Sequence, residues 1–191
     1  MSKIRTFIAI EIPEEIRNKI GELQNNLKGI GGRISWTKPG NIHLTLKFLG
    51  DTDEGVINEI AAELQQAVQD IADFKVTVKE TGTFPNFKRP RVIWIGAESE
   101  GGQLQKLATQ IEQCMENFGF KKENRRFSAH LTLGRVKDAK GIQPVIDKLK
   151  SYENFEAGSF TVKEFYLIKS ELHTAGAIYT PLKKIVLKKQ Q

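Results

Sequence analysis

The four-residue segment His-Leu-Thr-Leu occurs twice in this chain, at residues 43–46 and at residues 130–133. The two copies contain two of the 3 histidines in the sequence, although almost half of its 191 residues separate them. Imidazole titrates near neutral pH, so two imidazoles can act as acid and base in one reaction. A threonine hydroxyl can donate a hydrogen bond to a phosphate oxygen that carries negative charge. The repeated residue types therefore suit phosphoryl chemistry with two similar half-sites.

The spacing inside each segment places its histidine and threonine together. Side chains alternate between the two faces of a strand, so His43 shares a face with Thr45, and His130 shares one with Thr132. The leucines then point toward the core. In-line displacement at phosphorus needs a base beside the attacking oxygen and an acid beside the leaving oxygen. Two such strands that face each other across a cleft supply both groups.

Arg135 follows the second segment closely and is a candidate cation for the same phosphate, because a guanidinium can donate two hydrogen bonds to it. Strict alternation, however, places Arg135 on the face of the leucines. A β-bulge or a strand end at Gly134 is required to turn this side chain toward the histidines. The sequence alone leaves the direction of Arg135 open.

Aromatic and basic residues beside these segments are candidates for RNA contact. Phe84 lies in a basic, aromatic stretch that reads as a loop, and it is a candidate for stacking on a base. Phe48 shares a face with the leucines of the first segment, and Trp94 lies in an apolar strand, so core packing is favoured for both. Arg91 and Arg126 can contact an RNA backbone or remain solvated surface charges.

Other types of site fit the sequence less well. Zinc needs three or four ligands, and two histidines with no cysteine or carboxylate in either segment fall short of that number. We therefore expect no metal and no cofactor. The net charge of +6 favours anionic partners such as nucleic acid, and a non-catalytic RNA-binding module remains an alternative. The third histidine, His173, is followed directly by threonine and is expected in a loop or in the core.

The elements that must position these residues follow from the hydrophobic pattern. A helix is expected from Pro13 to about residue 27, because apolar residues recur there at helical spacing after an acidic first turn. Further helices are expected at residues 53–70, 104–115 and 144–149. Strands are expected at residues 4–12, 34–37, 74–83, 92–96, 159–171 and 178–187.

The order strand, helix, repeated segment, helix, strand occurs twice, which indicates a duplicated α+β architecture. We expect one domain, residues 1–191, made of two lobes related by a pseudo-twofold axis and joined near the Phe84 loop. Antiparallel or mixed sheets with outer helices would then surround a central cleft.

Several classes of protein are disfavoured by composition. No run of about 18 apolar residues occurs, so no membrane span is expected. The first residues lack the apolar stretch and cleavage site of a signal peptide. Cys114 is the single cysteine, which excludes an internal disulfide. We expect a cytoplasmic protein, and a monomer, since one chain contains both segments.

The repeated segments resemble the paired His-Xaa-Thr-Xaa motifs of the two-histidine phosphoesterase superfamily. The longer stretches at residues 42–50 and 127–135 are similar to its RNA 2',3'-cyclic phosphodiesterase branch, historically called 2'-5' RNA ligases. Residues 7–10 and 90–96 also look like that branch. The resemblance covers essentially the whole chain.

This resemblance implies a bilobal α+β fold and metal-independent hydrolysis of a terminal 2',3'-cyclic phosphate to a 2'-phosphomonoester. It implies that His43 donates a proton to the departing 3' oxygen and that His130 accepts one from water. Thr45, Thr132 and Arg135 would hold the phosphate. The implied partner is RNA with a cyclic phosphate end, tRNA fragments included, and the reverse reaction would join ends through a 2'-5' bond. A small cyclic nucleotide or an ADP-ribose cyclic phosphate is the alternative substrate.

Overall fold

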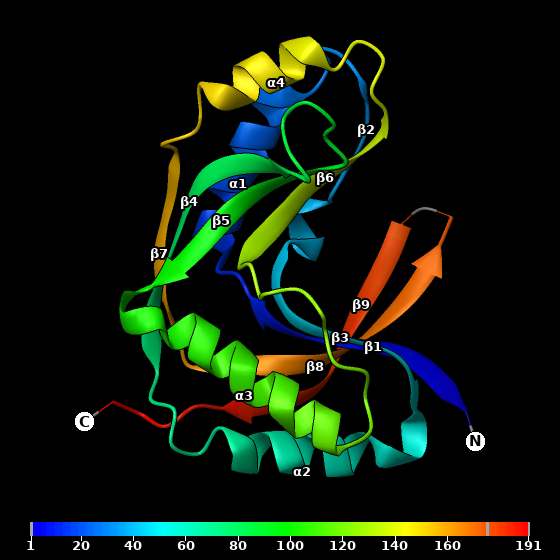
Figure 1. Ribbon diagram of the computed structural model, residues 1–191, viewed down its shortest axis with the longest axis vertical. Coiled ribbons are helices and arrows are strands. Elements are labelled where there is room, and N and C mark those ends of the chain that lie inside the picture. Colours follow the sequence, from blue (N-terminus) through cyan, green and yellow to red (C-terminus); the bar gives the residue numbers. More distant parts are fainter. Residues whose placement is uncertain (1, 175, 191) are drawn as a thin grey trace.

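The computed structural model describes residues 2–174 and 176–190, and within these ranges the chain forms two antiparallel sheets and four α-helices. The helices lie on one side of each sheet, as Figure 1 shows. The predicted α+β fold with antiparallel sheets is therefore confirmed.

The first sheet has the strand order β3-β1-β8-β9. Its central strand β1 is buried from Thr6 to Ile10, because both of its faces are covered. The bounds of its strands are β1 Lys3–Glu11, β3 His43–Asp53, β8 Glu164–His173 and β9 Gly176–Val186.

The second sheet has the strand order β2-β6-β5-β4-β7. All of its neighbouring strands are antiparallel. Its strands are β2 Arg33–Trp36, β4 Phe74–Phe84, β5 Val92–Ser99, β6 His130–Asp138 and β7 Glu156–Val162.

Two pairs of helices cover the two sheets. Helices α1 (Glu14–Leu27) and α4 (Gln143–Lys150) pack against β7 and β4 of the second sheet. Helices α2 (Ile57–Ala67) and α3 (Gln103–Asn117) pack against β9 and β3 of the first sheet, and both pairs are visible in Figure 1. One cluster of buried apolar side chains includes residues from both sheets and all four helices of the described ranges. The fold therefore has one main core.

Two expected elements differ from the observed ones. The helix predicted to begin at residue 53 begins at Ile57, because the Asp53 carboxylate accepts a hydrogen bond from Gly55 N at 2.9 Å and caps a 3-10 turn, Glu54–Val56. The single strand predicted at residues 159–171 is wrong. It is two strands, β7 and β8, and the chain passes from one sheet to the other at Lys163.

The two halves of the chain are interleaved between the sheets. Phe84, predicted in a loop, is instead the last residue of β4 and pairs with Val92 of β5, so residues 85–91 form a hairpin connection inside one sheet. The expectation that it joins two lobes is wrong. Strand β2 from the first half pairs with β6, and β8 from the second half pairs with β1. Such pairing between distant segments is invisible to local periodicity.

The strands that begin with the two histidines approach each other where the sheets meet. Strands β3 and β6 have Cα atoms within 8 Å of each other, although they belong to different sheets. Among the described residues, none of the helices combines the length and the apolar character needed to cross a membrane.

Candidate active site

The two repeated histidines are held by the same hydrogen bond. His43 donates its Nδ1–H to the backbone oxygen of Asn41 at 2.8 Å, and His130 donates its Nδ1–H to that of Ser128 at 2.7 Å. A carbonyl oxygen only accepts, so the proton of the neutral ring lies on Nδ1. In both rings Nε2 is then left as the nitrogen that can exchange a proton with a ligand.

The His43 ring packs against two aromatic side chains. Its centroid lies 4.7 Å from that of Phe7 and 5.1 Å from that of Tyr179. Burial lowers the pKa of His43 below its ordinary value of 6.5, and the hydrogen bond to Asn41 partly offsets this effect. The environment therefore favours the neutral imidazole in the free protein.

The His130 ring has a similar environment in the other sheet. Phe84 packs edge-on against it, with centroids 4.8 Å apart. Burial lowers the pKa of His130, the hydrogen bond to Ser128 raises it, and the positive charge of Arg135 lowers it further. Arg135 is thus close enough to His130 to act on its charge.

The threonines lie as strand alternation predicts. Thr45 and Thr132 are half-buried, whereas the leucines on either side of each are buried in the core. Within the part of the chain that the structure describes, neither threonine hydroxyl bonds to another protein group. Both hydroxyls remain available to a ligand.

A β-bulge interrupts each strand at the last leucine of the repeated segment. In β3, Thr45 pairs with Ala9 and Lys47 pairs with Ile8, so Leu46 is the extra residue. In β6, Leu133 is the extra residue in the same way, because Thr132 pairs with Trp94 and Gly134 pairs with Ile93. Each bulge reverses the alternation of the residues that follow it.

The bulge in β6 turns Arg135 away from the core. This side chain is exposed, and it makes no ion pair with any described residue. The irregularity that the sequence required is therefore present, at Leu133 and Gly134. Gly134 is needed there because a Cβ would lie 2.8 Å from Ile34 Cγ2 and 3.0 Å from Trp36 Cε3.

The bulge in β3 does the same for Phe48, so the expectation of core packing is wrong for this residue. Lys47 is buried instead, and Phe48 is 57% exposed, with its ring 6.0 Å from that of Phe7. Phe48 follows His43 by the same number of positions as Arg135 follows His130. That common offset is the sequence signal that could have placed Phe48 on the histidine face.

Trp94 is the second aromatic residue whose expected core position is wrong. It pairs with Thr132 across the sheet, and its indole lies over Gly82, where a Cβ would collide with the ring. Trp94 and Arg126 line one hollow of about 420 Å³ beside His130. Arg91, by contrast, is exposed just before β5 and lines neither this hollow nor the one beside Phe48.

Two buried polar residues that were not predicted from the sequence make hydrogen bonds at or beside the bulges. Gln24 donates hydrogen bonds of 2.8 Å to the backbone oxygens of Leu133 and Thr37. Lys47 donates to Glu112 Oε1 at 2.6 Å and to the backbone oxygen of Lys121 at 3.0 Å. Gln24 lies on the apolar face of the helix predicted from the sequence, and a polar residue at such a position could have indicated a buried hydrogen-bonding role.

No group of three or more histidine, cysteine, aspartate or glutamate side chains in the described ranges is arranged to hold a metal ion. Strands β3 and β6 contribute two imidazoles, two hydroxyls and one guanidinium to this region.

Known proteins are similar to this chain in both sequence and fold. An RNA 2',3'-cyclic phosphodiesterase of Methanocaldococcus jannaschii is 39% identical over 95% of this chain and 99% of its own length. A protein of the same name from Thermotoga maritima is 36% identical over 94% of this chain and 93% of its own.

Among solved structures, TT0787 of Thermus thermophilus matches with a TM-score of 0.82 and 29% identity, over 98% of this chain and 100% of that one. LigT of E. coli, solved in complex with 3'-AMP, matches with a TM-score of 0.79 and 28% identity over the same shares. Residues 12–174, which include both repeated histidines and Arg135, match the family described as the 2'-5' RNA ligase superfamily. The chain with these two half-sites belongs to the 2'-5' RNA ligase superfamily.

Proposed function

We propose that this protein hydrolyses the 2',3'-cyclic phosphate at the end of an RNA chain to a 2'-phosphomonoester. The observation that carries the proposal is the equivalence of the two half-sites. Each histidine donates Nδ1–H to the carbonyl two residues before it, at 2.8 and 2.7 Å, and shares a strand face with a threonine hydroxyl. The names of the relatives, RNA 2',3'-cyclic phosphodiesterase, support the same reaction.

The proposed roles follow the in-line geometry of displacement at phosphorus. Neutral His130 takes a proton from water at Nε2 as the water oxygen bonds to phosphorus. The bond from phosphorus to the 3' oxygen breaks, and His43, whose protonated form is favoured once the anionic phosphate lies beside it, gives its Nε2 proton to that oxygen. The product has a 2'-phosphate and a free 3'-hydroxyl, and the two imidazoles have exchanged protonation states.

Thr45, Thr132 and Arg135 hold the phosphate in this proposal. The hydroxyls donate to its non-bridging oxygens, and the guanidinium balances charge that grows in the transition state. Since side chains supply both the proton transfers and the positive charge, we propose a reaction independent of metal. Run in reverse, with a 5'-hydroxyl in the place of water, the same steps would join two RNA ends through a 2'-5' bond.

We also propose contacts to the RNA from the aromatic and basic residues near the half-sites: Phe84, Phe48, Arg91 and Arg126. Phe84 and Phe48 lie one on each side, because Phe84 packs on His130 and Phe48 packs on Phe7, beside His43. One chain contributes both half-sites, so we propose that a monomer acts on RNA fragments, tRNA fragments among them, in the cytoplasm.

The test is to incubate the protein with an oligoribonucleotide that ends in a 2',3'-cyclic phosphate and to follow the product by phosphorus NMR. We expect a 2'-phosphate, at the same rate with and without EDTA. A parallel reaction with a cyclic mononucleotide and with an ADP-ribose cyclic phosphate compares the alternative substrates. Absence of any 2'-phosphate overturns the proposal, and a 3'-phosphate overturns the assigned roles of the histidines.

A further inference from the structure

A second hollow lies on the His43 side of the site, and none of the residues proposed to transfer protons or to hold the cyclic phosphate lines it. It has a volume of about 370 Å³ and is lined by Phe48 and Leu49 of β3 and by residues 121–125, which precede β6. We call these residues the Phe48 groove.

The Phe48 groove is basic and has one exposed aromatic ring. Lys121, Lys122 and Arg125 contribute three positive charges, and Glu123 contributes one negative charge. Lys122 forms an ion pair with Glu116 at 3.1 Å, whereas Lys121 and Arg125 have no ion-pair partner among the described residues. Cations beside an exposed aromatic ring are the usual means of binding single-stranded nucleic acid, where phosphates pair with the cations and bases stack on the ring.

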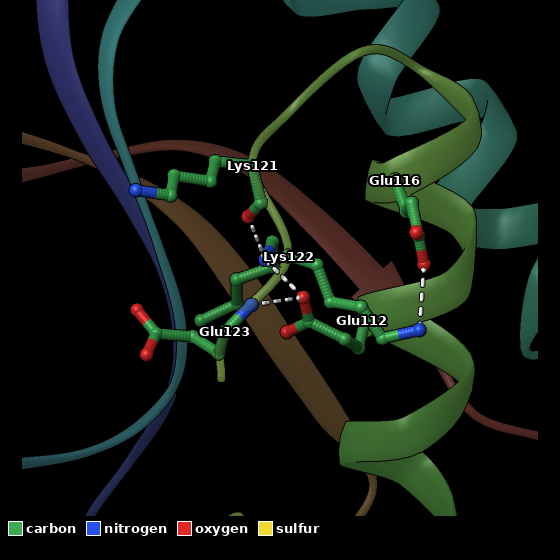
Figure 2. A network of polar contacts seen from close by, with 6 residues as sticks. Glu112, Glu116, Lys121, Lys122 and Glu123 are labelled. Carbon is green, nitrogen blue, oxygen red and sulfur yellow. Dashed lines mark hydrogen bonds and ion pairs between the residues drawn. The ribbon is translucent and has the colours of Figure 1, made fainter. Parts of the chain in front are cut away.

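The wall of the groove is fixed by an ion pair between buried Lys47 and half-buried Glu112. The side chain of Lys47 is 0% exposed, and it donates to Glu112 Oε1 and to the backbone oxygen of Lys121. The same Glu112 oxygen accepts a hydrogen bond of 2.9 Å from Glu123 N. Figure 2 shows how these contacts hold the segment from Lys121 to Glu123 against α3. A site whose wall is already ordered loses less entropy when a ligand binds.

The groove also lies on the side of the site where the proposed reaction places the RNA chain. Phe48 is in ring contact with Phe7, and Phe7 is in ring contact with His43. His43 protonates the 3' oxygen of the terminal ribose, while water enters on the side of His130. The ribose and the chain that continues from its 5' carbon must therefore leave the site on the His43 side.

We propose that the Phe48 groove binds the nucleotide that precedes the terminal one. Its base stacks on Phe48, and the phosphate that links it to the terminal nucleotide lies between Lys121 and Arg125. The protein is then selective for oligonucleotides over cyclic mononucleotides. This inference rests on the proposed function, because it assumes that the terminal cyclic phosphate lies between the two histidines.

The test compares two substrates and two variants. The substrates are 2',3'-cyclic AMP and an oligoadenylate with a 2',3'-cyclic end, and the measured quantity is the ratio of their kcat/KM values. The variant Lys121→Ala/Arg125→Ala removes the free cations and leaves the backbone bond to Lys47 in place. The matched control, Lys140→Ala/Lys188→Ala, removes the same charge from exposed positions outside the groove.

We expect the wild-type protein to prefer the oligonucleotide, and the groove variant to lose roughly tenfold or more of that preference, chiefly through KM. Phe48→Leu should also lower the preference, since stacking is lost while an apolar side chain remains. Equal losses on both substrates, or an equal loss in the charge control, overturn the proposal.

A binding measurement separates this inference from the proposed function. The probe is an oligoadenylate with a 2'-phosphate end, followed by fluorescence anisotropy at two salt concentrations. If neither cyclic substrate is hydrolysed, the proposed function fails, yet weaker binding and a smaller salt dependence in the groove variant still support the groove. Unchanged binding in that variant overturns the groove.

Discussion

The side chain of Gln24 donates a hydrogen bond of 2.8 Å to the backbone oxygen of Leu133, the extra residue in the bulge of β6. The same oxygen accepts a second hydrogen bond, from Thr37 N at 2.9 Å. A buried residue of helix α1 thereby stabilises the irregularity that exposes Arg135.

The variant Gln24→Met tests this relationship. It retains the volume of the side chain but removes both donated hydrogen bonds, so we expect a loss of roughly 1 kcal/mol in the free energy of unfolding. The loss is limited because Gln24 Oε1 has no hydrogen-bond partner in the native protein and is removed as well. Because the bulge that exposes Arg135 is then held less firmly, kcat/KM should fall even under conditions in which the variant is fully folded. Urea denaturation and steady-state kinetics provide the two readouts, and Gln66→Met, at an exposed position of α2, is the control.

Replacement of either repeated histidine should remove most of the activity. We expect His43→Ala and His130→Ala each to lower kcat at least about 100-fold, which is the usual scale of general acid or base catalysis. His173→Ala, at an exposed position in β8, should retain wild-type activity. An aryl phosphodiester separates the two roles, because a nitrophenolate leaves without a proton. On that substrate His43→Ala should recover much of its loss while His130→Ala does not, and equal recovery would contradict the assigned roles.

Arg135 should set the pH dependence of the reaction as well as its rate. Its charge lowers the pKa of His130, so Arg135→Met should raise that pKa and lower kcat/KM. The acidic limb of the profile of kcat/KM against pH reports the base, and it should therefore move to higher pH. Lys137→Met on the same strand serves as a charge-matched control, and an acidic limb that stays in place would argue against the contact.

Stability should decrease as the solution becomes acidic. In the folded protein the pKa values of His43 and His130 lie below 6.5, so below that pH the unfolded chain binds more protons than the native one. The contribution of the neutral rings is complete above 6.5, and it is lost as the pH falls through the folded pKa values. Each histidine can contribute a slope of at most about 1.4 kcal/mol per pH unit. Urea denaturation from pH 7.5 to 5 should show a smaller slope in His43→Gln than in His173→Gln, which serves as the reference.

Removal of one partner from the ion pair between buried Lys47 and half-buried Glu112 should lower the stability of the protein. Lys47→Met leaves the partly exposed Glu112 carboxylate without its cation, and we expect a loss of roughly 2 kcal/mol in the free energy of unfolding. The double variant Lys47→Met/Glu112→Gln should regain part of that loss, because the carboxylate that has lost its cation is then replaced by a neutral amide. Additive losses in the thermodynamic cycle would show that the two residues do not interact.

The sequence was most informative where the physics is local. The alternation of His43 with Leu44 and of His130 with Leu131 predicted which side chains are buried, because each bulge changes only the faces of the residues that follow the repeated segment. The apolar face of α1 was likewise readable from the spacing of Ile16, Ile20 and Leu23. These inferences need only the period of a strand or a helix.

The errors arose where strand pairing decides the outcome. A bulge is a mismatch between two strands, so nothing within β3 alone reveals that Lys47 is buried and Phe48 is exposed. The position of Trp94 depends on Gly82 in the neighbouring strand, which leaves room for the indole ring. The break at Lys163 arises because the segments before and after it pair with strands of different sheets. Each of these features is set by residues distant in the sequence.

The interleaving of the two halves has a consequence for how the protein acquires its site during folding. The first sheet is incomplete until β1 has met β8, and the second is incomplete until β2 has met β6. Pairing between such distant strands is slow, because the entropy cost of closing a long loop precedes the stabilising contacts. Neither half of the chain can therefore complete its own sheet, and the two histidines are held in place only when both halves are present.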